Sequence, residues 1–488
     1  MNDQNNLNRQ SVKNQSPLPM EPLSSPSGYH PGRRPKRSGS WIKKLCILVI
    51  LALVIGAGGY FFIIKGRPSL TRGKTAPPSE STVESRTEAE NGQRERDAKK
   101  AELLLSAQKL SLQYNYDEAL SLLQDSGFTE DPQVQAALQE LEEVRSTLVA
   151  QDITTVTHVF FHSLIVDPSK TFSPHVAYDG YNQVMTTIPE FNKILQNLYD
   201  KGFVLVSIHD LAQEEESPEG GMRMVARDDL LLPPGKKPLV MSQDDVCYYE
   251  YMTGQGFANR LVIGKDKRVT CEMDLEDGSQ VRGDYDLIPI LDHFIDEHPD
   301  FSYKGAKAII AVTGYNGIFG YRTAPKYSEN PTYEADKAAA AAVAAALKEE
   351  GYELASHSWG HRNLSTISYA DLVTDSNKWR DEVESLTGKV DILLFPFGAD
   401  VGDWHPYAPD NDKFKYLYDL GFRYFCNVDS AVHWVQVGPD YFRQARRNLD
   451  GYRMWRDITE PDNKKLSDLF DANEVFDPVR PTPVAPMN

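Results

Sequence analysis

Between residues 156 and 426 the sequence alternates short apolar stretches with longer segments of helical periodicity, and this alternation constrains the fold more than any other feature. We expect strands at residues 156–161, 203–207, 239–241, 308–313, 352–356, 391–395 and 422–426. Helical segments lie between them at residues 189–200, 285–297, 333–350, 377–387 and 413–420. Because a helix that follows a strand carries the chain back to the starting edge, such an alternation predicts an α/β protein with a parallel sheet.

Seven strands in this arrangement favour a sheet that closes into a barrel. The alternative is an open, doubly wound sheet, but the glycine-rich turn that such a sheet uses to bind a nucleotide is absent after residues 156–161. Residues 258–284 interrupt the alternation, and we predict that they form a hairpin-like insertion that turns at residues 264–266.

Residues 45–64 form an uncharged run of twenty residues, which is long enough to span the hydrocarbon core of a bilayer. The alternative is a cleaved signal peptide, but the run is longer than a signal-peptide core and begins far from Met1. More basic residues precede the run than follow it, which favours a cytoplasmic N-terminus. We therefore predict a transmembrane signal anchor over residues 41–65, with the rest of the chain outside the cell membrane.

The remaining segments differ in composition. Residues 1–40 are predicted to be a disordered basic tail, residues 66–96 a linker, residues 97–150 a small all-α spacer, residues 151–460 the barrel, and residues 461–488 a proline-rich tail. The sequence "YNYDEA" in the spacer is similar to one tetratricopeptide-type helical hairpin. Since such hairpins normally need several copies, we favour a simple spacer that holds the barrel away from the membrane.

Charge and cysteine content limit the functions available to the chain. Residues 1–67 carry a charge of +8, so the remainder carries −26 of the total of −18, and we expect no nucleic-acid partner. Of the four cysteines, Cys46 lies in the predicted anchor. Cys247, Cys271 and Cys426 remain, an odd number that does not describe a disulfide framework, and a bridge between Cys247 and Cys271 is left open.

Two aspartates, Asp244 and Asp245, follow the predicted strand at 239–241. Taken alone, the pair is more often a loop doublet that caps a helix or is simply solvated. Within a regular strand the two side chains would point to opposite faces, so they can serve one site only if the strand ends there. In a β/α barrel the active site lies where the strands end, which is the position of this pair.

His357 and His361 follow another predicted strand, and their spacing of four places both on one face if the segment forms a helical turn. Two histidines and one carboxylate supply three ligands, as catalytic zinc requires, with the fourth position open for water. The other aspartate is then available as a base. The same ligands also suit other divalent ions.

The motifs "QDD", "HSWGH" and "FPFG", in this order, resemble the first three motifs of the carbohydrate esterase family 4 polysaccharide deacetylases. The resemblance covers about residues 155–455, including the lead-in at 191–211, and implies a distorted (β/α)7 barrel. It implies that Asp244 is the catalytic base and that Asp245, His357 and His361 bind the metal, Zn²⁺ in the first place with Co²⁺ and Mn²⁺ as alternatives.

The sequence also departs from the family pattern. Val246 stands where the family has a glycine, Leu394 stands where it has an arginine that positions the base, and the late motif that supplies the general acid is not visible. We take His162, at the end of the first strand, as the candidate acid, with His433 as the alternative. Three arginines near residue 445 are candidates for the missing positive charge, although a basic cluster on the surface is the more common explanation of such a stretch: Arg443, Arg446 and Arg447.

Four further residues are candidates for sugar contact by stacking and hydrogen bonding: Tyr315, Arg322, Pro396 and Phe397. The chain is thus expected to be a metal-dependent deacetylase that removes N-acetyl groups from a cell-wall or related polysaccharide. The alternative is a catalytically impaired protein of the same fold that binds glycan or scaffolds cell-wall proteins. A metal-dependent phosphodiesterase would need more carboxylate ligands and is the weakest alternative.

Overall fold

The computed structural model describes residues 80–174 and 178–487. The predicted basic tail and the anchor at residues 41–65 lie outside the described residues. In the described part of the chain, no helix combines the length and the apolar character that crossing a bilayer requires.

A ring of seven parallel strands forms the centre of the fold. Its strands are β2 (Thr157–Phe161), β7 (Lys237–Gln243), β11 (Ile309–Val312), β12 (Glu353–Ser356), β13 (Ile392–Leu394), β14 (Tyr424–Val428) and β16 (Phe442–Asn448). Their spatial order is β7, β11, β12, β13, β14, β16, β2, and the pairing of Ile309 with Ser242 and of Ile310 with Gln243 closes the ring. The predicted seven-stranded parallel barrel is confirmed, and all seven strands end at one rim.

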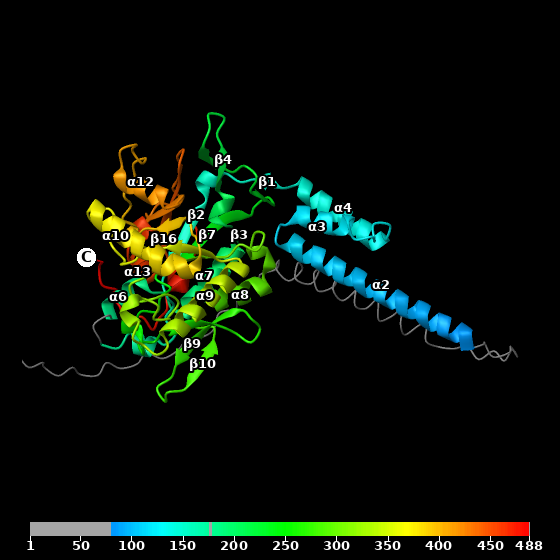
Figure 1. The fold of residues 1–488 in the computed structure, drawn as a ribbon, viewed down its shortest axis with the longest axis horizontal. Helices are drawn as coiled ribbons and strands as arrows, with labels where there is room; N and C mark the ends of the chain where they lie inside the picture. Colours follow the sequence, from blue (N-terminus) through cyan, green and yellow to red (C-terminus); the bar gives the residue numbers. More distant parts are fainter. Residues whose placement is uncertain (1–79, 175–177, 488) are drawn as a thin grey trace, which may run out of the picture. The chain divides into compact units, whose positions relative to one another are not determined.

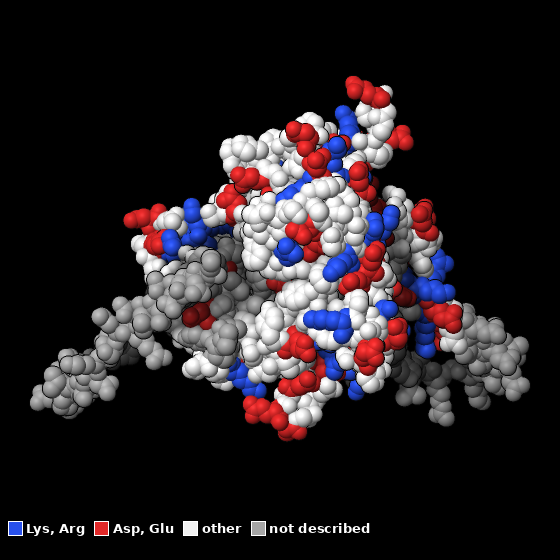
Figure 2. Space-filling view, turned by 60° about the vertical axis from the view of Figure 1, so that its left-hand side comes forward, with Lys and Arg blue, Asp and Glu red and all other residues white. Residues whose placement is uncertain are grey.

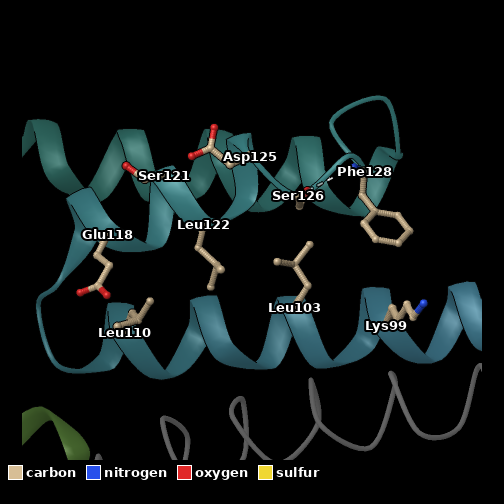
Figure 3. A pocket seen from close by; sticks show the side chains of 9 residues that line it. All are labelled: Lys99, Leu103, Leu110, Glu118, Ser121, Leu122, Asp125, Ser126 and Phe128. Atoms are coloured by element: carbon tan, nitrogen blue, oxygen red, sulfur yellow. Dashed lines mark hydrogen bonds between the residues drawn. The ribbon is translucent and has the colours of Figure 1, made fainter.

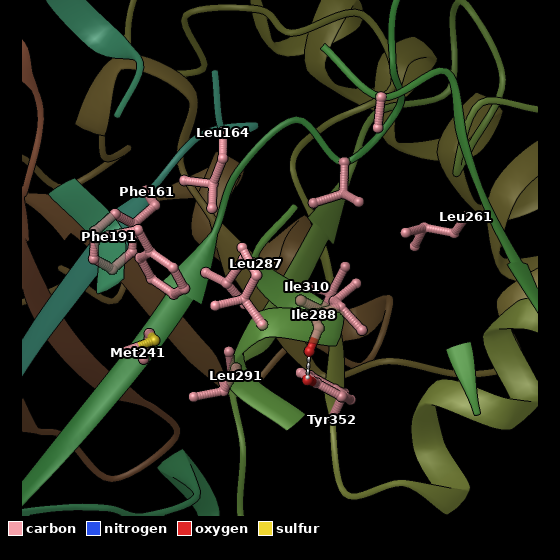
Figure 4. Close-up of a cluster of buried hydrophobic side chains, with 14 of the residues drawn as sticks. Phe161, Leu164, Phe191, Met241, Leu261, Leu287, Ile288, Leu291, Ile310 and Tyr352 are labelled. Carbon is pink, nitrogen blue, oxygen red and sulfur yellow. Dashed lines mark hydrogen bonds between the residues drawn. The ribbon is translucent and has the colours of Figure 1, made fainter. Parts of the chain in front are cut away.

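The strands are buried on both faces, as expected for a parallel sheet covered by helices. Alternate side chains divide between two apolar clusters. Met241 and Ile310 belong to the cluster that also contains Phe191 and Leu291 from the surrounding helices (Figure 4). Val240, Ala311 and other residues of the opposite strand face belong to the second cluster. This period of two fixes which residues point into the barrel.

Helices connect the strands and surround the barrel (Figure 1). The longer ones are α7 (Ile188–Asp200), α8 (Leu287–Glu297), α9 (Tyr333–Glu349), α10 (Tyr369–Trp379), α12 (Asp412–Asp419) and α13 (Gly451–Thr459). The shorter ones are α5 (Pro168–Thr171), α6 (Tyr178–Val184), α11 (Ser385–Thr387) and α14 (Ala472–Val475). Helix α9 stops just before a glycine, since Gly351 has a φ of 93° and a Cβ at this position would lie 2.3 Å from the Gly305 carbonyl oxygen.

The seven strands of the ring are not the seven that the sequence predicted. The expected strand near residue 203 exists as β3 (Phe203–Leu205), but it pairs with the first half of β7 and lies outside the ring. The seventh member is β16, whose sequence "FRQARRN" lacks an apolar pattern. Sequence analysis missed β16 because its arginines are buried in ion pairs instead of being solvated.

Three small antiparallel units accompany the barrel. The predicted insertion at residues 258–284 forms β8 (Arg260–Ile263), β9 (Val269–Asp274) and β10 (Gln280–Gly283), with the expected turn after β8. The others are the hairpin of β4 (Ala212–Glu216) and β5 (Met222–Ala226), and the pair β1 (Val149–Ala150) with β6 (Leu231–Leu232); β15 (Val435–Val437) pairs with β16. Cys247 and Cys271 are buried free thiols, so the bridge left open by the sequence is not formed.

The predicted spacer consists of three helices: α2 (Glu80–Leu112), α3 (Tyr116–Gln124) and α4 (Pro132–Ser146). Since α2 starts at Glu80, part of the segment predicted as linker is helical. Leu103 of α2 faces Leu122 of α3 across a pocket of about 480 Å³ (Figure 3). After α2 the chain contacts the barrel, because the Tyr114 hydroxyl donates to the Asp300 carbonyl oxygen at 2.6 Å.

The segment from residue 461 onward was expected to form a tail, but it packs against the barrel helices. Arg480 forms an ion pair with Glu190 of α7 at 2.6 Å, and both side chains are fully buried. Phe470 and Val475 join the main apolar cluster. The prolines therefore shape a packed segment without regular periodicity, which is why the sequence pattern did not reveal it.

Candidate metal centre and active site

Asp244 and Asp245 leave β7 at the rim, and the backbone aims both carboxylates at the same place. The Asp244 amide continues the sheet by donating to the Phe161 carbonyl oxygen of β2 at 2.8 Å. Asp245 has a φ of 58°, a left-handed conformation that aspartate tolerates better than most residues. Val246 does not have a positive φ, and its amide donates to the Ala311 carbonyl oxygen of β11 at 3.1 Å. The left-handed residue is thus Asp245, so a glycine is not needed at 246.

His357 and His361 follow β12. The sequence suggested a helical turn between them, but the structure has no helix there. Ser358 and His361 both have a positive φ, and the segment is an irregular loop. Asp375 of α10 holds this loop, because its carboxylate accepts from the amides of Trp359 and Gly360, each at 2.8 Å. Sequence analysis missed Asp375, since nothing in its helix distinguishes it from a solvated residue.

Asp245, His357 and His361 form a candidate metal centre, with ligand atoms all within 4.8 Å of one another. Ligand atoms around one tetrahedral Zn²⁺ lie about 3.3 Å apart, so small side-chain rotations suffice. His357 donates from Nδ1 to the Leu394 carbonyl oxygen at 2.7 Å, which leaves Nε2 as the ligand atom. The buried ring is kept neutral because burial lowers the pKa of His357. The donor set therefore fits a divalent metal.

Asp244 lies beside this centre, and a buried arginine holds it. Its Oδ2 is 3.7 Å from Nε2 of His357, while its Oδ1 accepts from Nη1 of Arg446 at 2.6 Å. Burial alone would raise the pKa of the Asp244 carboxyl, but the charge of Arg446 and the hydrogen bond that it donates outweigh burial and hold that pKa below its usual range. Asp244 is therefore a carboxylate at neutral pH.

Arg446 comes from β16 and supplies a positive charge near the base, where Leu394 of β13 offers none. The other two arginines of this stretch have different partners. Arg443 pairs with Asp400 at 2.8 Å, and Arg447 pairs with Asp468 at 2.7 Å. Of the three basic candidates that the sequence offered, the structure brings only Arg446 to Asp244.

His162, the candidate acid, directly follows β2 and is half-buried next to Asp244. Because Phe161 pairs with Gln243, His162 and Asp244 occupy matching positions beyond the two strands. Nδ1 of His162 lies 3.2 Å from the Val184 carbonyl oxygen, and donation from it leaves Nε2 free. His433 is exposed in the loop between β14 and β15, and within the described residues it forms no hydrogen bond or ion pair with the metal-centre residues.

The four predicted sugar-contact residues have different surroundings. Phe397 is 68% exposed, and its ring lies 4.6 Å from the His361 ring, measured between centroids. Tyr315 stacks on Tyr249, whose hydroxyl donates to Asp245. Arg322 donates to the Tyr248 and Asn316 carbonyl oxygens and so joins two loops, and Pro396 is buried. Phe397 is thus the predicted residue most open to a ligand.

One aromatic residue beside the site was missed by the sequence analysis. Tyr251 is 57% exposed and stacks on Tyr249, with 5.3 Å between ring centroids. The motif "CYYEY" contains a visible cluster of tyrosines, which was the available signal. Tyr251 stacks on Tyr249, which donates to Asp245, and Phe397 lies against the ring of His361. The two exposed rings thus lie near two different metal-ligand candidates.

Comparisons with known proteins give one sequence match and several structural ones. Residues 305–424 match the family model described as polysaccharide deacetylase. None of the curated proteins matches the sequence. A Streptococcus pyogenes deacetylase, PplD, solved with acetate, is similar at 13% identity and a TM-score of 0.32 over 61% of this chain and 94% of its own. A de-N-acetylase from Aggregatibacter actinomycetemcomitans is similar at 12% identity and a TM-score of 0.34, over 61% and 95%.

Proposed function

We propose that the chain, whose residues 305–424 match the polysaccharide deacetylase family model, is a metal-dependent N-deacetylase of an extracytoplasmic polysaccharide. The observation that carries the proposal is the arrangement of Asp244 beside the cluster of Asp245, His357 and His361 at the barrel rim. It combines a candidate metal centre with a separate ionised carboxylate, which are the two groups that hydrolysis of an amide needs.

Each residue has a role in the proposed reaction. Asp245, His357 and His361 would hold a divalent metal, which would supply a Lewis acid for the acetyl carbonyl group. Asp244 takes a proton from the attacking water, and Arg446 keeps its carboxylate oriented and ionised. His162 gives a proton from Nε2 to the departing amine as the C–N bond breaks. The products are acetate and a free amino sugar.

The metal is proposed to be Zn²⁺, with Co²⁺ and Mn²⁺ as alternatives. Two imidazole nitrogens and one carboxylate oxygen suit Zn²⁺ and leave a position open for water and substrate. Metal analysis of protein purified without added metal tests this, and a stoichiometric content of another ion would replace zinc in the proposal.

Recognition of the glycan is proposed to be local to the rim. Acidic and basic side chains are interspersed over the face shown in Figure 2, which does not suggest broad electrostatic attraction on that side. Phe397, Tyr251 and Tyr315 offer aromatic surface beside the metal centre, and such surface stacks on the apolar faces of sugars.

The assay is acetate release from N-acetylated oligosaccharides, beginning with chitohexaose, with and without a chelator. We expect chelator-sensitive release that the Asp244→Asn variant reduces by about 10²- to 10⁴-fold, the range for loss of a general base. Release that survives complete metal removal, or that is unchanged in Asp244→Asn, would overturn the proposal.

A second function, glycan binding with impaired catalysis, is favoured by the Arg446 ion pair. A guanidinium that binds one carboxylate oxygen of Asp244 at 2.6 Å stabilises the ionised form and therefore weakens it as a base. Glycan binding and bound metal without acetate release from any N-acetylated substrate would support this second function.

Membrane attachment through residues 45–64 is proposed on the uncharged run and on the basic residues that precede it. It would keep the barrel next to a fixed polymer outside the cell. Protease treatment of intact cells tests the proposal, because the barrel should be cleaved while a cytoplasmic marker is protected.

A further inference from the structure

A groove of about 430 Å³ lies beside the candidate metal centre. It is formed by the loop after β11, the loop after β12 and helix α10. The side chains that matter for its chemistry are Tyr315, Lys326, Trp359, Arg362 and Lys378. No role in metal binding or proton transfer has been assigned to any of them.

The groove has an unusual charge balance for a chain with a net charge of −18. Within the described residues, Lys326, Arg362 and Lys378 take part in no ion pair, whereas many other basic residues of the barrel do. Lys378 Nζ lies 4.2 Å from the centroid of the Trp359 ring, and Lys326 Nζ lies 4.8 Å from that of Tyr327. Aromatic faces hold these two cations without neutralising them.

Two carboxylates also line the groove, but neither forms an ion pair with the cations. Asp375 is buried and accepts from the two loop amides of Trp359 and Gly360. Asp371 is exposed and accepts from the Ser368 hydroxyl at 2.9 Å. Among the lining residues, three cations therefore outnumber two carboxylates, both of which already accept hydrogen bonds. The charge of Arg362 acts on Asp375, and a further carboxylate, Glu382, accepts from the Trp359 indole N–H at 2.6 Å.

The groove and the metal centre share one loop of the chain. Gly360 and Arg362 line it and are the direct neighbours of His361. On the other wall, Tyr315 stacks on Tyr249, whose hydroxyl donates to Asp245. A ligand in the groove would therefore lie against the loop that carries His361.

We propose that this groove binds an anionic group of the substrate, so that the preferred glycan is an N-acetylated chain that also carries carboxylate or phosphate. The inference rests on the proposed deacetylase function and names its substrate class. The guanidinium of Arg362 suits either group because its paired N–H donors match two oxygens. Trp359 and Tyr315 supply aromatic faces for the attached sugar.

The test compares binding of matched oligosaccharides to the complete chain in detergent, using calorimetry. Hyaluronan hexasaccharide, which is N-acetylated and carries carboxylates, is compared with neutral chitohexaose. N-acetylglucosamine 6-phosphate is compared with N-acetylglucosamine, so the two pairs distinguish carboxylate from phosphate. We expect one anionic ligand to bind on the order of tenfold more tightly than its neutral partner, from three exposed charge contacts, with the preference falling as salt rises.

The variant for this test combines Lys326→Gln, Arg362→Gln and Lys378→Gln, and the matched control is Lys464→Gln, an exposed lysine of the C-terminal segment. The triple variant should lose the anionic preference and keep its affinity for the neutral ligands, whereas the control should keep both. Circular dichroism melting checks that the variant is folded.

The outcomes separate the two proposals. Equal binding of charged and neutral ligands by the unmodified chain, no binding of either anionic ligand, or an anionic preference that survives in the triple variant would each overturn the groove proposal. A preference that depends on the three cations supports it even if no acetate is released, in which case the deacetylase proposal alone has failed.

Discussion

The buried ion pair between Arg446 and Asp244 gives a prediction whose size follows from the structure. Arg446 is fully buried and Asp244 nearly so, and their nitrogen and oxygen atoms are 2.6 Å apart. Removing one partner of such a pair leaves an uncompensated buried charge and typically costs about 3–5 kcal/mol. We therefore expect Arg446→Met to lower the free energy of unfolding by about 3–5 kcal/mol at pH 7 in the presence of a chelator.

The loss should depend on pH in a defined direction. In the unmodified chain the pKa of Asp244 is below its ordinary value, so the pair stabilises the fold above that value and is lost only at strongly acidic pH. Without Arg446, burial should raise the pKa of Asp244. Ionising it then costs stability as pH rises, by up to about 1.4 kcal/mol per pH unit. The difference between the two proteins should shrink from pH 7 to pH 4.

The assay is urea unfolding followed by tryptophan fluorescence at pH 7 and at pH 4. The matched control is Arg456→Met, because Arg456 pairs with Glu460 on the surface and its loss should cost about 1 kcal/mol or less. The reasoning would be refuted if Arg446→Met cost no more than the control at pH 7, or if its cost were the same at both pH values. Arg446→Lys should recover part of the stability, since it keeps the charge.

Three further predictions concern the site. His361→Ala should abolish stoichiometric metal binding, measured by metal analysis after dialysis, whereas His293→Ala, at an exposed histidine of α8, should not; retained metal would exclude His361 as a ligand. Asp375→Ala should weaken metal binding by about 10- to 100-fold, because it frees the loop that carries His361; calorimetry giving an unchanged Kd would contradict this role. Phe397→Ala should raise KM by about 2- to 10-fold and leave the melting temperature unchanged, since the ring is exposed; an unchanged KM would exclude sugar contact.

Local sequence was informative where the chemistry lies at strand ends. An apolar stretch followed by "QDD", and another followed by "HSWGH", identify two strand ends with candidate ligands. Since all strands of a parallel barrel end at one rim, these two segments meet without any further information on the fold. The same logic selected His162 as a candidate because it ends a strand, and the structure places it next to Asp244 because β2 and β7 are neighbours.

The sequence was less informative where a residue depends on distant partners. It could not select Arg446 from its basic neighbours, because Asp244 lies 202 residues away and β16 has no apolar pattern. It predicted a helical turn for the two histidines, whereas Asp375 of α10 holds an irregular loop. It also suggested that Val246 was unsuited to the turn, although the left-handed conformation falls on Asp245.

The sequence by itself determined the barrel class and the residues that gather at its rim, because strand periodicity and strand ends are local properties. Only the tertiary structure decided the backbone conformation of Asp245, the arginine that holds Asp244, and the unpaired cations beside His361. Each of these depends on which segments lie side by side in space. That is set by the packing of the whole chain, since a buried charge takes the partner that its neighbours in the fold bring within hydrogen-bond distance.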